Sequence, residues 1–160
     1  MSRPAELAAL PPDYGDLYEA DDPEAFDAAA APPPADIDGL AEEFLRVLGL
    51  LPVVVAREEW IVASDGAWLL RSFLVRLLVA ENGEGVMTGV KRLNEKLTDE
   101  QRAIVEGLPP IVATRDGVIA SHQAIAEAFL PRARRLATRW PSELEAATRG
   151  HLEREGLWAS

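Results

Sequence analysis

The sequence predicts an all-α protein, an antiparallel bundle of five to seven helices that follows an extended acidic arm rich in proline and alanine. From residue 38 onward, apolar residues recur at intervals of three and four, as on one face of an α-helix. Capping residues and glycine or proline stops separate these periodic stretches. No stretch after residue 63 alternates in the manner of a strand. We therefore divide the chain into an arm, residues 1–37, and a helical bundle domain, residues 38–158.

The arm is distinguished by its composition. It contains seven of the twelve prolines, and nine acidic residues against a single basic one. Proline has no N–H group and favours extended geometry in the residue before it, so the arm is predicted to be an extended connector. The rest of the chain is almost charge-balanced, unlike the basic surface that nucleic acids require.

The first two helices are predicted around Pro52. Asp36 or Asp38 is suited to cap the first helix, because a short carboxylate accepts from the free N–H groups of a first turn. Pro52 either ends that helix or begins the next one. Residues 53–62 are predicted to be a short helix rather than a strand, since their charged run does not alternate with apolar residues.

A longer helix is predicted from Ser64 or Asp65, as its cap, to about Glu81, where Asn82 and Gly83 tolerate a left-handed turn. Residues 69–78 of this helix carry a wide apolar stripe, which predicts a buried face.

Three further helices are predicted in the second half of the chain. Thr98 and Gln101 have the spacing of a capping box and begin a short helix that ends near Gly107. Thr114 begins the next long helix. Pro141 is predicted to be the first residue of the last helix, which ends at about residue 155.

Cellular location and metal binding follow from what the sequence lacks. It has no cysteine, no signal-peptide pattern and no apolar run near the roughly 20 residues that cross a bilayer, so we expect a cytoplasmic protein without a membrane partner. Asp36 and Asp38 have the spacing of a magnesium-binding pair. They precede a helix and no phosphate loop accompanies them, so helix capping is the preferred interpretation and no metal site is predicted.

Glu58, Glu59 and Trp60 form one candidate site. Two carboxylates beside an indole are suited to bind a small cationic ligand by charge and cation–π contact. The alternative is a solvated helix start with Trp60 in the core.

Lys91 and Arg92 form a second candidate site. Two cations in a turn are suited to hold a phosphate group, and the alternative is that they only solubilise the turn or favour a helix end.

Arg115 and His122 form a third candidate site. Seven residues are two helical turns, so both side chains are predicted on one side of the helix, about 10 Å apart. Arg, six residues and His resemble the active motif of HEPN-type ribonucleases, which are helical bundles that pair such helices across a homodimer. His122 would act as acid or base and Arg115 would stabilise the phosphorane charge. The alternative is that His122 lies at the boundary of the core.

The helical part resembles the C-terminal helical domain of kanamycin- and lincosamide-type nucleotidyltransferases. The resemblance covers about three quarters of the chain. It rests on five segments: EEW (58–60), LLRSFLVRLLVAEN (69–82), GVKRLNEKL (89–97), TDEQRAIVEGLPP (98–110) and FLPRARRLA (129–137).

The resemblance implies that Glu58, Glu59 and Trp60 face the substrate and that Lys91 or Arg92 faces phosphate. Family members bind ATP and Mg²⁺ through an N-terminal domain with a Gly-Ser turn and Asp-x-Asp, and this sequence lacks that pattern. ATP and Mg²⁺ are therefore expected only with a separate nucleotidyltransferase catalytic domain, and no cofactor is expected in this chain.

Three functional hypotheses follow. The leading one is a helical substrate- or partner-binding module of a nucleotidyltransferase-like protein, not catalytic on its own. The second is a HEPN-like, RNA-cleaving bundle that uses Arg115 and His122 and forms a homodimer. The third is a non-enzymatic protein-interaction module that binds its partner through the acidic arm.

Overall fold

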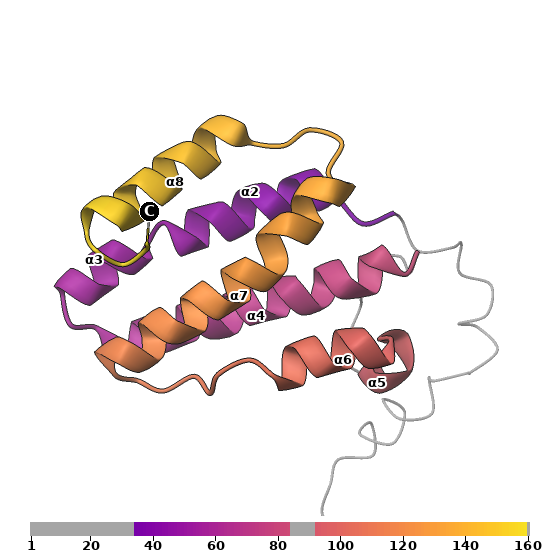
Figure 1. The fold of residues 1–160 in the computed structure, drawn as a ribbon, viewed down its shortest axis with the longest axis horizontal. Helices are drawn as coiled ribbons and strands as arrows, with labels where there is room; N and C mark the ends of the chain where they lie inside the picture. The colour runs from indigo at the N-terminus through magenta and orange to yellow at the C-terminus, as the bar shows by residue number, and fades with distance from the viewer. Residues whose placement is uncertain (1–33, 84–91, 160) are drawn as a thin grey trace, which may run out of the picture. The chain divides into compact units, whose positions relative to one another are not determined.

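The computed structural model describes residues 34–83 and 92–159. Within these ranges the regular structure is helical and no strand occurs (Figure 1), so the predicted all-α class is confirmed. The helices are α2 (Ile37–Leu48), α3 (Leu51–Ala56), α4 (Trp60–Glu81), α5 (Leu93–Lys96), α6 (Asp99–Glu106), α7 (Arg115–Leu136) and α8 (Ser142–Arg154). None of these helices has the length and apolar character needed to cross a membrane. Residues 1–33 of the predicted arm lie outside the described ranges.

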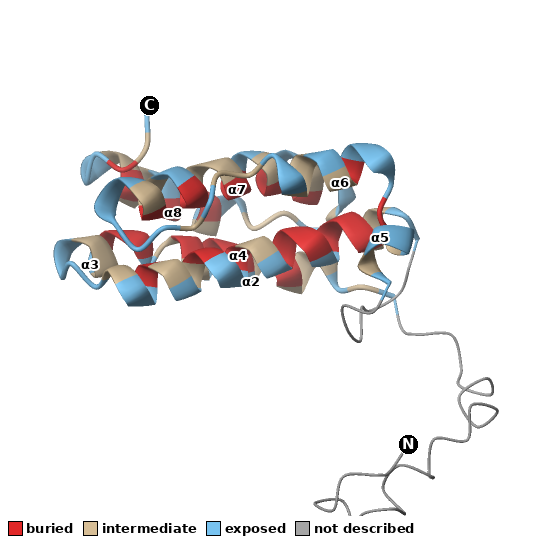
Figure 2. Cartoon of the chain, turned by 90° about the horizontal axis from the view of Figure 1, so that it is seen from below, coloured by how far each residue is buried: buried red, intermediate tan, exposed pale blue. Residues whose placement is uncertain are grey.

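The core forms where α2, α4 and α7 pack against one another, with α8 against α2 and α3 (Figure 1). Buried residues follow the inward sides of these helices, as Figure 2 shows. At the centre, the fully buried rings of Phe44 on α2 and Phe129 on α7 stack with their centroids 3.8 Å apart. Burying each ring contributes roughly 1.5–3 kcal/mol before entropy is counted.

The two longest helices run in the same direction. His122 of α7 lies beside Gly66 near the start of α4, and Arg135 of α7 pairs with Glu81 at the end of α4. α2 runs the opposite way, because its Asp38 accepts from the backbone N–H of Thr138, which follows α7. The predicted antiparallel arrangement therefore does not extend to the α4–α7 pair. The chain between them returns through α5 and α6 to the side where α4 began (Figure 1).

The start of α4 corrects the sequence prediction. α4 begins at Trp60, so Ser64 and Asp65 lie inside it and do not cap it. The Ser64 hydroxyl instead donates to the Trp60 carbonyl at 2.9 Å, a bond that a serine can make within a helix. The predicted end at Glu81 is confirmed, and Gly83 follows with φ 76°.

Other predicted helix ends agree more closely with the structure. Asp36 caps α2 by accepting from the Gly39 N–H at 2.8 Å, as predicted. The capping box of Thr98 and Gln101 is present, and Thr114 caps α7. Pro141 is the residue before α8 rather than its first residue. The single-turn helix α5 was not predicted.

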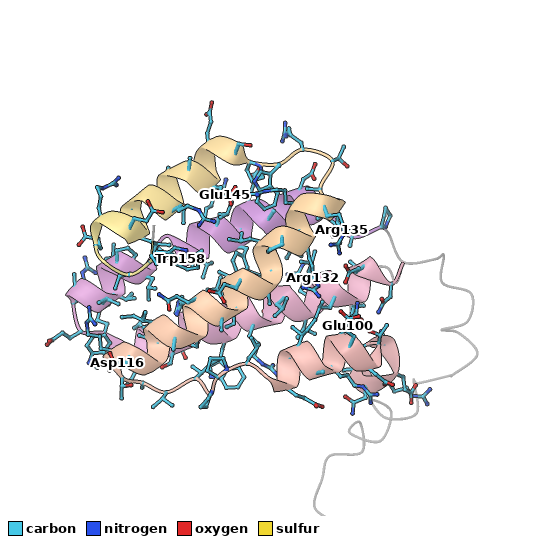
Figure 3. All side chains as sticks on the ribbon, viewed as in Figure 1. Glu100, Asp116, Arg132, Arg135, Glu145 and Trp158 are labelled. Carbon is cyan, nitrogen blue, oxygen red and sulfur yellow. The ribbon has the colours of Figure 1, made fainter. Side chains whose placement is uncertain are left out.

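A buried glutamine joins α6 to the end of α4. The Gln101 amide donates to the Leu78 carbonyl, the Glu81 carboxylate and the Asn82 side chain, each at 3.1 Å. Its oxygen accepts from the Asn82 amide at 2.7 Å and from the Thr98 N–H at 3.0 Å. Glu81 also pairs with Arg135 of α7, which Figure 3 labels near the end of that helix. We call Gln101, Asn82, Glu81 and Arg135 the Gln101 network.

Candidate functional site

An apolar pocket of about 250 Å³ lies where α4 and α7 meet the α2–α3 corner. Most of its lining is aliphatic, and the exceptions are Asp65, Gly66 and His122. The lining residues are Val47, Leu50, Leu51, Val54, Val62, Ala63, Asp65, Gly66, Leu69 and His122. A concave apolar site with few polar groups is the usual form of a small-molecule site in proteins.

The buried polar group that lines the pocket is His122 of α7, which is only 2% exposed. Its Nδ1 lies 2.6 Å from the Val118 carbonyl oxygen, one turn earlier. A carbonyl oxygen can only accept, so Nδ1 carries the proton of the neutral ring. Nε2 is then a hydrogen-bond acceptor.

Gly66 of α4 lies next to the imidazole ring of His122. A Cβ atom at this position would lie 3.5 Å from Nε2 of His122, in ordinary van der Waals contact. Gly66 and His122 both line the pocket. Because Gly66 has no side chain, nothing from this position covers the Nε2 edge of the ring.

Burial sets the charge of this imidazole. Desolvation lowers the pKa of His122 below its ordinary value of 6.5, and the hydrogen bond with the Val118 carbonyl opposes this only in part. The neutral ring is therefore the dominant form at pH 7. A neutral acceptor at the base of an apolar pocket selects a hydrogen-bond donor.

The rim of the pocket is unusually apolar for a protein surface. Leu50 is 58% exposed, Val62 is 52% exposed and Leu69 is 42% exposed. Asp65 is the exposed charged residue among them. Contiguous exposed apolar residues with a polar border are characteristic of binding surfaces.

The predicted cation site at Glu58, Glu59 and Trp60 has a different arrangement. Glu58 has φ 56° and Glu59 precedes α4 without a side-chain capping bond, and both are exposed. Trp60 is partly buried and packs against the core. None of the three residues lines the pocket.

The predicted phosphate site can be placed only in part. Lys91 lies outside the described residues. Arg92 has φ 58°, which turns the chain into α5, and its exposed side chain lies 3.9 Å from Glu95. An exposed ion pair at this distance contributes little to stability.

Arg115 and His122 lie in different environments although both belong to α7. The Arg115 side chain is 58% exposed and lies 3.9 Å from Asp116, labelled at the start of α7 in Figure 3. His122 is buried and faces α4. Sequence spacing predicted their shared helix correctly, but it carried no information about Gly66 or the pocket.

A second depression, between α2 and the start of α8, is larger and more polar. Its volume is about 530 Å³, and Glu42, Arg46 and Arg139 are among its lining residues. Glu42 forms ion pairs with both arginines. Both arginines of this depression therefore already have a carboxylate partner.

The described residues contain no cluster of three or more His, Cys, Asp or Glu side chains placed to hold a metal ion. No protein-family model, curated protein or solved structure matches the chain. The resemblance to nucleotidyltransferases therefore stays a prediction from the sequence.

Proposed function

We propose that the helical domain is a binding module, not catalytic on its own, that holds a small and mainly apolar molecule in the pocket between α2, α3, α4 and α7. The observation that carries the proposal is the buried His122, whose Nε2 edge borders an apolar pocket. Nε2 is an acceptor at an apolar pocket, so a ligand that donates to it gains specificity as well as affinity.

The pocket defines a ligand class. Its volume of about 250 Å³ is below the roughly 300–1,000 Å³ of sites for drug-sized molecules, so a fragment-sized ligand fits best. Aliphatic walls require an apolar body, and Nε2 requires an N–H or O–H group. Asp65 at the rim favours a positive charge over a negative one, so a small amine belongs to the class.

The proposal includes the wider setting that the sequence suggests. The module would serve as the substrate- or partner-binding half of a nucleotidyltransferase-like protein. A separate catalytic domain would then bind ATP and Mg²⁺. The role of Glu58, Glu59 and Trp60 toward substrate, and that of Lys91 and Arg92 toward phosphate, belong to this wider setting and not to the pocket.

Four probes with the same aromatic body test the proposal: phenethylamine, phenethyl alcohol, ethylbenzene and phenylacetate. Nuclear magnetic resonance titration of the full chain should show shifts at the Gly66 and His122 amides. We expect the amine and the alcohol to bind more tightly than the hydrocarbon, because each donates to Nε2. Phenylacetate should bind most weakly, because its carboxylate cannot donate a hydrogen bond to Nε2 and is repelled by the negative charge of Asp65.

His122→Leu replaces the imidazole with an apolar side chain and removes the acceptor. The substitution should weaken the binding of phenethyl alcohol about five- to tenfold, which corresponds to the loss of one hydrogen bond. The affinity for ethylbenzene should be almost unchanged. His151→Leu on α8 is the matched control and should change neither. Equal affinity for all four probes would contradict the proposed ligand class.

Activity assays of the purified chain test the rest of the proposal. Nucleotidyl transfer that depends on Mg²⁺ would contradict a module without catalysis of its own. RNA cleavage that is lost in both His122→Ala and Arg115→Ala would favour the ribonuclease alternative instead.

A further inference from the structure

We infer that the exposed face of α4 is a self-association surface, on which two copies of this chain pair their α4 helices in opposite directions. This inference is independent of the proposed ligand. We define the α4 face as Ile61, Val62, Asp65, Trp68, Leu69, Ser72 and Arg76, each of which is exposed. Its most exposed apolar members, Ile61 and Trp68, are 75% and 55% exposed.

The apolar part of the α4 face is unusual for a helix that faces water. Leaving a large aromatic ring and neighbouring aliphatic side chains in solvent forgoes the stabilisation that their burial would give. Tryptophan and arginine are the residues most enriched at the energetic centres of protein interfaces. Trp68 and Arg71 already lie together, with the guanidinium carbon 5.5 Å from the ring centroid.

The charges on the α4 face indicate which partner fits. Asp65 and Arg76 are eleven residues apart, close to three full turns, so they lie on one line along the helix about 16 Å apart. Trp68, Leu69 and Ser72 lie between them. The face thus carries an acidic group and a basic group three turns apart, with Trp68 and Leu69 between them and Ile61 and Val62 beyond Asp65.

A twofold axis between Leu70 and Arg71 makes this pattern complementary to itself. When a second α4 helix runs in the opposite direction, each Asp65 lies opposite the partner's Arg76, and the two Trp68 rings meet near the axis. An interface of this kind uses the same patch on both subunits and closes as a dimer. A parallel pair would instead place like charges opposite each other, which is unfavourable.

The α4 face borders the ligand pocket without coinciding with it. Gly66 follows Asp65 by one position and precedes Trp68 by two, so it points about 160° around the helix from Trp68. Asp65, Val62 and Leu69 lie at the boundary and belong to both surfaces. Arg76 belongs only to the α4 face and therefore tests association without changing the pocket lining.

Charge reversal with mixing tests the inference. Wild-type chain should sediment as a dimer at high concentration and dissociate on dilution. Asp65→Arg alone and Arg76→Asp alone should each be largely monomeric, because every pair across the axis becomes repulsive. An equal mixture of the two variants should form a heterodimer, since each of its two pairs again joins opposite charges.

Asp116→Arg on α7 and Arg154→Asp on α8 are matched controls that reverse exposed charges elsewhere, and both should associate like the wild type. Circular dichroism should show the same helix content in all variants. A wild-type chain that stays monomeric at every concentration would overturn the inference, as would variants that remain dimeric alone. Mixtures that stay monomeric would overturn the antiparallel pairing of Asp65 with Arg76.

Discussion

The two ends of the α4–α7 pair treat buried polar groups in opposite ways. Where α4 ends, both the NH₂ group and the oxygen of the Gln101 side chain form hydrogen bonds with several partners. Where α4 begins, His122 uses Nδ1 for a backbone carbonyl and turns its other nitrogen toward an apolar pocket. A polar group whose bonding capacity is filled holds a fold together, and one with capacity left in a pocket is available to a ligand.

The largest expected effect concerns the Gln101 network. Gln101→Leu should lower the free energy of unfolding by about 3 kcal/mol, because it removes the buried amide that bonds with the Leu78 carbonyl, Glu81, Asn82 and the Thr98 N–H. Gln123→Leu is the matched control, since Gln123 makes one bond, to the Leu157 carbonyl. It should cost about 1 kcal/mol in the same denaturant titration. Equal losses of unfolding free energy in the two variants would show that Gln101 does not stabilise the end of α4 more than a single hydrogen bond would.

Glu145 offers a second test of a satisfied group. Burial raises the pKa of this carboxyl, but hydrogen bonds from Trp140 and Arg134, with the charges of Arg134 and Arg149, outweigh it and lower the pKa below 4.5. Its contribution is therefore present above pH 4.5 and lost as the pH falls through the lowered value. Glu145→Gln should lower the free energy of unfolding by about 1–2 kcal/mol at neutral pH. In thermal unfolding at a series of pH values, the variant should lose less stability than the wild type as the pH falls.

His122 should make stability depend on pH in a milder range. Because its pKa is lowered in the folded protein, the unfolded chain binds the proton more readily. Stability is then complete above about pH 6.5 and falls as the pH is lowered from there toward the folded value. Unfolding of His122→Leu should lack this slope, whereas His151→Leu should keep it. A slope unchanged in His122→Leu would contradict a buried neutral imidazole.

The smallest expected change separates stability from binding. Gly66→Ala replaces a glycine within a helix and should stabilise the fold by up to about 1 kcal/mol. The same methyl group would lie against Nε2 of His122 and narrow the pocket, so phenethyl alcohol should bind more weakly. Thermal unfolding and the probe titration together measure both effects. Tighter binding in this variant would contradict the position assigned to the ligand.

Local signals predicted much of the fold. The caps at Asp36, Thr98 and Thr114 were predicted because capping depends on residues within one turn of each other. The predicted start of α4 is wrong because Ser64 and Asp65 are residue types that often cap helices. The turn through Glu58 that precedes the helix contains no glycine that would indicate it in the sequence.

Long-range features were not predictable in the same way. The direction of α7 relative to α4 depends on how α5 and α6 return the chain. The pocket brings together residues from separate helices, with Gly66 of α4 beside His122 of α7. His122 was a candidate residue in the sequence, but its spacing from Arg115 suggested phosphate chemistry. Its burial, which sets its charge and its partner, follows only from tertiary packing.

The nitrogen chemical shifts of His122 test the central claim most directly. In the full chain at neutral pH we predict a neutral ring with the proton on Nδ1, and a shift at Nε2 when phenethyl alcohol is added but not when ethylbenzene is added. A protonated ring, a proton on Nε2, or equal responses to the two probes would contradict the account.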